Sequence, residues 1–459
     1  MASLLDGCTP WPEVFVDRYW SSGCWRGCTL DNLLREWARR SGPRTALVDA
    51  ATGTRLTYAN LNRRVDRMAA GFRLRGLRPG QRAVVQLPNV PEFVITVFAL
   101  MRAGVVPVLC PMDRRGPEVA ELVRITEAAG YVAPAAHRGA DHMALAAEVA
   151  AQGPFLRRVF SYEAPGAEDP YGGLRIDATG CHYFPLGSVE APPERPLAPD
   201  AGQVALLLLA EDREGHPVLV PRTHNDYAYQ ARAAAEAVSL TEDDVCLVAL
   251  PAASNLAFGC PGIVGTLSAG GTVVLAASPR PGECFPAVAR EGVTLTSLDA
   301  EAARLWLDDV RPAPRADLGS LRLVQAGPAR SADAPLPPPT VERLAAALGP
   351  GGRLQQVVAS ADGPITLTRL GDPDDTVFGT QGRPLSPDDE TRLVDADGGD
   401  VPDGESGELL TRGPYTPRGY YRAPDRNARS FTTTGHLRTG TLARRTPDGE
   451  MIVTGRIRT

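Results

Sequence analysis

Residues 209–227, LAEDREGHPVLVPRTHNDY, hold many of the side chains in this sequence that could carry out acid–base chemistry. Carboxylates and imidazoles are the usual groups for moving protons at a reacting atom. We therefore name four candidate bases: Glu211, His216, His224 and Asp226. Among them lies a single glycine, Gly215, ahead of Pro217.

The second half of this segment, VPRTHNDY, resembles the stretch that follows the phosphate-binding loop in adenylate-forming ligases. The likeness is strongest to ligases that activate salicylate or 2,3-dihydroxybenzoate for siderophore assembly by nonribosomal peptide synthesis. It continues over nearly all 459 residues, with motifs LTY at 56–58, PNVPE at 88–92, LQQVVASADG at 354–363 and GPYTPRGYY at 413–421. The chain is accordingly identified as similar to this family.

The resemblance implies an α/β fold, the large N-terminal domain of an adenylate-forming ligase. That domain would have two doubly wound sheet subdomains plus a small β-rich, barrel-like subdomain. We expect the first α/β subdomain at 1–190, the second, with the phosphate loop and aryl pocket, at 200–350, and a distal α/β and β-rich part at 351–459, ending at the hinge. In the family a lid domain with a catalytic lysine follows a Gly-Arg pair, matched here by Gly455 and Arg456. Because the sequence ends at Thr459, we expect that C-terminal lid domain to be absent.

The phosphate-binding loop itself differs from the family. Where the family carries Ser-Gly-Gly-Thr-Thr-Gly-x-Pro-Lys, only Gly215 and Pro217 match among Ala210, Glu211, Asp212, Arg213, Glu214, Gly215, His216, Pro217 and Val218. Such a loop binds phosphate through converging backbone N–H groups and a lysine. A carboxylate beside a phosphate costs roughly 1–4 kcal/mol per contact. We expect ATP binding to be weak or lost, and the alternative is a loop that extends into solvent.

Three further positions of the implied nucleotide site have also changed, and a fourth, Arg456, matches the family. Val358 stands in place of the aromatic platform, Thr441 in place of the ribose-binding aspartate, and Arg456 keeps the pair before the hinge. Asp362 replaces the magnesium-side glutamate, so it either ligates a hard cation or forms an Asp-Gly turn. We predict no certain cofactor and no metal, with Asp362 as the one possible ligand, and weak or lost binding of ATP and Mg²⁺.

Residues 251–262 resemble the aryl-acid pocket of the salicylate and dihydroxybenzoate ligases. Asn255 matches the asparagine that contacts the acid and its ortho hydroxyl, and Cys260 takes a position where salicylate members tend to have cysteine. Ser254 replaces a histidine. The predicted substrate-binding set is completed by Gly327 and Ile365. The alternative is an ordinary strand-to-helix turn with Cys260 as core filler.

The composition excludes several functional classes. A net charge of −6 with 22% charged residues gives no reason to expect nucleic acid as a partner. We find no signal peptide and no apolar run long enough for a membrane span, so we expect a cytoplasmic protein. The eight cysteines lack metal-site spacing. All 48 cationic residues are arginine, which excludes any mechanism that needs a lysine.

Alternating elements must position these residues. Residues 61, 65, 68, 69 and 72 recur at helical spacing after Thr57, a plausible helix cap. Strands are predicted at 83–86 and 105–110 around a helix at 92–102, which makes a βαβ crossover. Further strands are expected at 204–209, 245–250, 272–276, 391–395, 407–412 and 451–454, with a helix from about Asn225. Residues 160–203 are predicted to form a long surface connection.

Three functions remain open at this stage. The first is an aryl-acid adenylation-type protein that has lost ATP-dependent activity and binds an aryl acid or aryl thioester beside a carrier protein or biosynthetic enzyme. The second is an enzyme that transfers a preactivated aryl group from a carrier thioester without ATP, using one of the four candidate bases. The third is a weak but genuine salicylate-AMP ligase.

Overall fold

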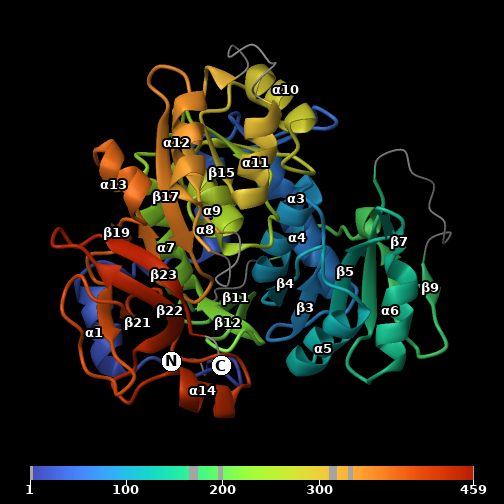
Figure 1. The fold of residues 1–459 in the computed structure, drawn as a ribbon. Helices are drawn as coiled ribbons and strands as arrows, with labels where there is room; N and C mark the ends of the chain where they lie inside the picture. The colour runs from blue at the N-terminus through green and yellow to red at the C-terminus, as the bar shows by residue number, and fades with distance from the viewer. Residues whose placement is uncertain (1–3, 165–173, 195–199, 310–317, 329–333, 458–459) are drawn as a thin grey trace.

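A computed structural model describes residues 4–164, 174–194, 200–309, 318–328 and 334–457 (Figure 1). The first sheet has eight strands in the order β12-β11-β4-β3-β5-β8-β10-β9. Its inner strands run parallel, and β12 and β9 pair antiparallel at the two edges. The strands are β3 (Arg82–Val85), β4 (Val106–Leu109), β5 (Gly130–Pro134), β8 (Arg158–Tyr162), β9 (Arg175–Ile176), β10 (His182–Pro185), β11 (Val204–Glu211) and β12 (Pro217–Thr223).

The second sheet has nine strands in the order β19-β18-β17-β16-β15-β13-β14-β1-β2, with a parallel centre from β17 to β1. Its strands are β1 (Thr45–Asp49), β2 (Arg55–Thr57), β13 (Val245–Val248), β14 (Thr272–Leu275), β15 (Leu295–Leu298), β16 (Leu323–Ala326), β17 (Arg353–Ala359), β18 (Ile365–Leu367) and β19 (Arg383–Pro384). A short hairpin, β6 (Ala136–His137) with β7 (Ala140–Asp141), lies apart from both large sheets.

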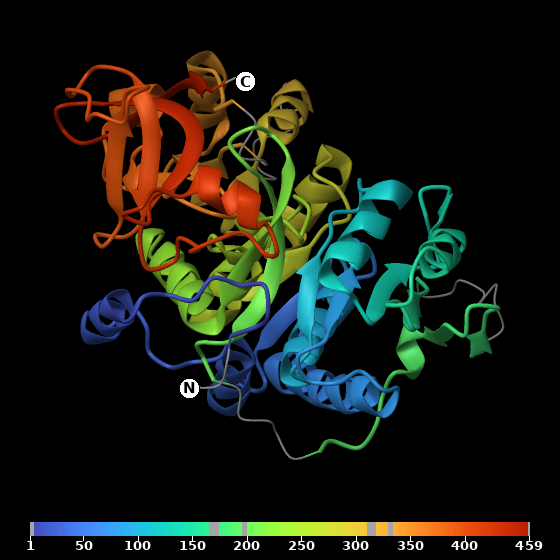
Figure 2. The same ribbon diagram turned by 90° about the horizontal axis from the view of Figure 1, so that it is seen from below.

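A third, antiparallel sheet of four strands forms the C-terminal part: β20 (Glu390–Val394), β21 (Gly407–Arg412), β22 (Leu437–Arg445) and β23 (Met451–Arg456). Its own small core contains Leu393, Leu409, Ala443 and Met451. Figure 2 shows the β11–β12 hairpin passing between this sheet and the first α/β unit. The hairpin therefore lies where the three parts of the chain meet.

Helices cover the large sheets (Figure 1). Helix α3 begins as predicted after Thr57, whose side chain accepts a hydrogen bond from the Asn60 amide, and the predicted apolar face is buried. The helices are α1 (Glu13–Ser21), α2 (Leu30–Arg40), α3 (Tyr58–Leu74), α4 (Pro91–Arg102), α5 (Gly116–Thr126), α6 (His142–Ala151), η1 (Leu186–Ser188), α7 (His224–Ala237), α8 (Asn255–Gly259), α9 (Gly262–Ala269), α10 (Pro281–Glu291), α11 (Ala300–Asp309), α12 (Pro338–Ala347), α13 (Asp374–Gly379) and α14 (Pro424–Ser430).

The predicted strands and helices are confirmed to within a few residues, but the surface connection at 160–203 is wrong in part. Phe160 belongs to β8, and β10 adds a further parallel strand to the first sheet. The strand escaped prediction because it has four residues, and only Tyr183 and Phe184 within it are buried. The sheets also exchange strands across the expected segment boundaries. Residues 45–57 join the second sheet, and residues 204–223 join the first.

Among the residues that the structure describes, no helix is both long enough and apolar enough to cross a membrane.

Candidate functional site

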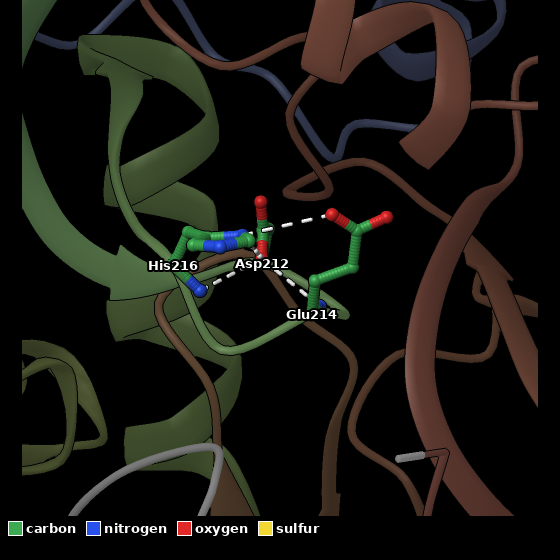
Figure 3. Close-up of side chains that lie close together, drawn as sticks. All are labelled: Asp212, Glu214 and His216. Carbon is green, nitrogen blue, oxygen red and sulfur yellow. Dashed lines mark hydrogen bonds and ion pairs between the residues drawn. The ribbon is translucent and has the colours of Figure 1, made fainter. Parts of the chain in front are cut away.

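The segment that stands in place of a phosphate loop is a closed hairpin turn between β11 and β12 (Figure 3). The Asp212 carboxylate Oδ1 accepts hydrogen bonds from the amides of Glu214 and His216, both at 2.9 Å. The Asp212 amide donates to the His216 carbonyl, and the Gly215 amide donates to the Asp212 carbonyl. Gly215 has φ +84°, which suits a glycine in this turn. Four backbone amides that could have faced a phosphate are therefore already used within the turn.

The turn is also attached to the four-stranded sheet and to α14. Arg213 Nε lies 3.4 Å from Glu408 Oε1, and Arg456 Nη2 donates to the Asp212 carbonyl at 3.3 Å. Gly440 packs so closely on the turn that a Cβ there would lie 2.8 Å from the Arg213 Cα atom. These contacts contradict the alternative in which the segment extends into solvent without partners.

Asp212, Glu214 and His216 form the one group of potential metal ligands found among the described residues, with ligand atoms within 4.8 Å of one another (Figure 3). His216 Nδ1 lies 3.6 Å from both Asp212 Oδ1 and Glu214 Oε2. Yet Arg426 lies 3.8 Å from Asp212 and Arg429 lies 3.6 Å from Glu214. The positive charges beside both carboxylates oppose a cation there. We therefore assign this group to stabilising the turn.

A cavity of about 510 Å³, here called the acidic cavity, opens where strands β4, β11, β15 and β17 end. Ligands of parallel α/β sheets bind at this edge. The lining of the acidic cavity includes Ala210, Glu211, Ser254, Asn255, Asp113, Arg114, Asp299, Glu301 and Ser360. Four carboxylates thus face one guanidinium, which itself pairs with Glu118 at 2.7 Å. A polyphosphate would be repelled here.

Ser254 and Asn255 lie together in the acidic cavity, as the prediction of a substrate pocket requires. Ser254 Oγ caps α8 by accepting from the Ala257 amide. The Asn255 side chain is a hub: Oδ1 accepts from Tyr227 and Gln230, each at 3.0 Å, and Nδ2 donates to the Ser360 carbonyl at 2.9 Å. The side-chain amide of Asn255 therefore holds the cavity wall in place through hydrogen bonds within the protein.

The other three predicted substrate-binding residues do not line this cavity. Cys260 and Ile365 are fully buried in the main hydrophobic core. Burial raises the pKa of the Cys260 thiol to about 12, so it remains protonated. Gly327 follows β16, where its backbone packs against the carbonyl of Val357. All three are closely packed, and their part in substrate binding stays a prediction.

We predict that Gly327→Ala lowers the free energy of unfolding by about 1–3 kcal/mol, because an added Cβ would lie 1.8 Å from the Val357 carbonyl oxygen. Gly282 is the matched control, since a Cβ there meets nothing within 4 Å and the site is helical. Gly282→Ala should be neutral or stabilising by up to about 1 kcal/mol. Urea unfolding of both variants measures the difference, and equal stabilities would contradict this packing role.

The residues predicted for a nucleotide fall into different places. Arg213, Gly215, Val358, Thr441 and Arg456 line a second cavity of about 800 Å³ between the turn, β17 and the four-stranded sheet. Its wall is rich in proline and apolar side chains, among them Pro335, Pro337, Pro338, Phe378 and Ile452. Ala210 and Glu211 face the acidic cavity instead, and Val218 faces away, toward α5. The structure therefore brings only some of the predicted nucleotide-site residues together around one cavity.

Asp362, the possible magnesium ligand, is buried. One oxygen accepts from Tyr420 Oη at 2.9 Å, and the other accepts from Ser360 Oγ. Burial raises the pKa of this carboxyl group. Each carboxylate oxygen therefore accepts a hydrogen bond from a protein hydroxyl group.

Of the four candidate bases, Glu211 is the one that lines the acidic cavity. Its carboxylate makes no hydrogen bond or ion pair with any residue in the described part of the chain. His224 is buried, its Nδ1 accepts from the Leu30 amide, and burial lowers its pKa to about 4. Asp226 is buried against Arg222, and His216 belongs to the turn.

Sequence reasoning missed Asp113, Asp299 and Glu301 as cavity residues. Asp113 follows β4, and Asp299 and Glu301 follow β15 at the start of α11. A signal was present, because side chains just after parallel strands gather at one edge of a sheet. Strand β12 was also missed, although β11 and β12 pair over seven residue positions.

Comparisons with known proteins agree with this architecture. The family described as AMP-binding enzyme matches residues 34–421. The 2,3-dihydroxybenzoate-AMP ligase of Bacillus subtilis is 40% identical, over 99% of this chain and 79% of that protein. The salicyl-AMP ligase / salicyl-S-ArCP synthetase of Mycobacterium tuberculosis is 41% identical, over 99% of this chain and 77% of that protein.

A solved structure, Mycobacterium smegmatis MbtA in its apo form, is 41% identical and superposes with a TM-score of 0.87. It covers 100% of this chain, which spans 81% of that one. The two proteins therefore share one fold. By sequence and by structure, the chain belongs to the family of AMP-binding enzymes.

Proposed function

We propose that this chain is an aryl-acid AMP-ligase-like protein of secondary metabolism that binds an aryl acid or aryl thioester and has lost ATP-dependent adenylation. One observation carries the proposal: the Asp212 carboxylate accepts the Glu214 and His216 amides inside the turn. A fixed protein anion thus takes the donors that a phosphate would need. Displacing it would cost the turn its hydrogen bonds, about 0.5–1.5 kcal/mol each.

The charge of the acidic cavity favours one form of the ligand. A free aryl carboxylate would approach Glu211, Asp299 and Glu301, whereas a thioester carries no charge at the acyl group. The similar proteins are named for aryl acids and, in one case, for transfer to an aryl carrier protein. We therefore favour an aryl thioester over the free acid and a carrier protein or biosynthetic enzyme as its source.

Calorimetric titration tests the aryl pocket. The S-salicyl thioester of N-acetylcysteamine should bind at least about 10-fold more tightly than salicylate. Asn255→Ala should weaken thioester binding by about 10-fold, because it removes the hub that shapes the cavity wall. Asn60→Ala is the control, because the Asn60 side chain on α3 makes an exposed hydrogen bond with Arg63 and does not line the cavity. Tighter binding of salicylate, or thioester binding that Asn255→Ala leaves intact in a folded protein, would reject the pocket.

Glu211 favours the second function, transfer of a preactivated aryl group. As a base it could take the proton of an amine that attacks the thioester carbonyl, and the products would be an amide and a free thiol. If so, Glu211→Gln should lower thiol release from the thioester by about 100-fold without ATP. If the unaltered chain releases thiol no faster than the reaction without protein, this enzyme activity is rejected and binding remains as the function.

A further inference from the structure

A third cavity, of about 650 Å³, lies between α5 and α14 over the edge strand β12. Figure 1 shows these three elements at the lower side of the molecule. We call it the edge cavity. It shares Arg114 and Leu209 with the acidic cavity, and the two otherwise have different walls. Its volume lies within the range of small-molecule sites, about 300–1,000 Å³.

The floor of the edge cavity is apolar. Leu122 and Ile125 come from α5, and Leu209, Val218 and Leu219 come from the β11–β12 hairpin. The Tyr421 amide donates to the Leu219 carbonyl, which holds the segment before α14 against the edge strand. This floor would cover an aromatic ring or a short aliphatic chain.

The rim is cationic. Its five guanidinium groups belong to Arg114, Arg124, Arg422, Arg426 and Arg429, and its three carboxylates belong to Glu118, Glu121 and Asp425. The first three arginines pair closely with Glu118, Glu121 and Glu127, so the charge available to a ligand comes from Arg426 and Arg429. The sign is opposite to that of the acidic cavity, where acids outnumber guanidinium groups. An anion is therefore favoured at the edge cavity and disfavoured at its neighbour.

Two arginines of α14 have donors available for such an anion. Arg426 Nη1 already donates to the Pro217 carbonyl at 2.5 Å, which leaves its Nε and Nη2. Arg426 Nε lies 3.8 Å from Asp212, and Arg429 Nε lies 3.6 Å from Glu214. Both separations exceed hydrogen-bond length. Their side chains are 33% and 54% exposed. Guanidinium groups present planar pairs of donors that match carboxylate and phosphate oxygens.

We propose that the edge cavity is a second binding site, for an amphipathic anion whose apolar body lies on the floor. Its carboxylate or phosphate head pairs with Arg426 and Arg429. The site is separate from the aryl pocket and does not depend on the proposed function. Because the same arginines lie beside Asp212 and Glu214, the head group competes with those carboxylates for them.

Fluorescence titration with two matched probes tests the charge. We expect 2-naphthoate to bind at least about 10-fold more tightly than 2-naphthylmethylamine, which has a ring of the same size and a cationic head. The double variant Arg426→Gln with Arg429→Gln should weaken naphthoate by at least about 5-fold. Arg304→Gln, an exposed arginine on α11, is the control and should change nothing. Equal affinity for the two probes would overturn the proposal.

Two further variants locate the probe. Ala423→Phe should fill the edge cavity and weaken naphthoate, whereas Asn255→Ala, in the acidic cavity, should leave its affinity unchanged. The reverse pattern would place naphthoate in the aryl pocket and overturn the edge site, without affecting the thioester test. Thermal unfolding checks that each variant is folded. If Ala423→Phe does not fold, the double arginine variant decides.

Discussion

Asp226→Ala should lower the free energy of unfolding by about 3–5 kcal/mol, because it leaves the Arg222 charge buried without its partner. The Arg222 side chain is 1% exposed, and its Nε donates to Asp226 Oδ1 at 2.8 Å. The other carboxylate oxygen accepts from the amide and hydroxyl of Thr223 at 2.6 and 2.7 Å, which caps α7. One substitution therefore removes an ion pair and a helix cap. Equilibrium unfolding in urea measures the loss.

The double variant Asp226→Ala with Arg222→Leu separates the two causes. Removing both charges should restore part of the stability lost in Asp226→Ala, since no unpaired charge then stays buried. Arg304→Ala, at an exposed pair with Asp308, should cost less than about 1 kcal/mol. A cost below about 1 kcal/mol for Asp226→Ala would contradict the structural role and reopen Asp226 as a functional group.

The stability of the fold should fall as pH rises from about 4 to about 7, owing to Asp389. Burial raises the pKa of this carboxyl group to about 7. Its Oδ2 accepts from the Ser386 amide at 3.1 Å and from Tyr415 Oη. The residue is partly exposed, but its Oδ1 is enclosed and has no hydrogen-bond partner among the described residues. Ionising this carboxyl group in the folded state is therefore unfavourable.

The direction of the change in stability with pH follows from the number of protons that each state binds. The folded state keeps the proton up to about pH 7, whereas the unfolded chain releases it near its ordinary value of 3.8. The folded state binds more protons within that window, so each step upward in pH favours unfolding. The full shift corresponds to about 4 kcal/mol, and we expect roughly 2 kcal/mol because the residue is partly exposed.

Asp389→Asn removes the titration and keeps a side chain of the same shape. Its free energy of unfolding should fall less than that of the unaltered chain between pH 5 and pH 8, as measured by urea unfolding at both values. Asp403→Asn, in an exposed turn, is the control and should preserve the original difference. If Asp389→Asn shows the same difference as the unaltered chain, Asp389 is not the group responsible.

The fold was largely predictable because its signals are local and regular. Thr57 before an apolar helical face predicted α3, and the Pro-Asn turn followed by an apolar run predicted α4. The short strand β10 and the edge strand β12 were not predictable from periodicity. Strand β10 has two buried residues, and β12 contains Pro217 and Pro221, which are unfavourable in a strand.

For the candidate site, the motifs gave residue types and not the directions of the side chains. Ser254 and Asn255 do line a cavity, but Cys260 and Ile365 point into the core beside them. The acids at 211 and 212 illustrate the same limit. Glu211 faces a cavity, whereas Asp212 turns inward to accept backbone amides. Consecutive side chains of a strand point to opposite faces. The pairing of β11 with β12 determines which of these faces is turned toward the cavity.

Calorimetric titration of MgATP into this chain tests the central claim most directly, with the aryl thioester titrated into the same preparation to show that it is folded. Because the Asp212 carboxylate occupies the backbone amides that a phosphate would need, we expect no saturable MgATP binding below about 1 mM. A dissociation constant below about 0.1 mM would contradict the account, as would salicylate-dependent release of pyrophosphate.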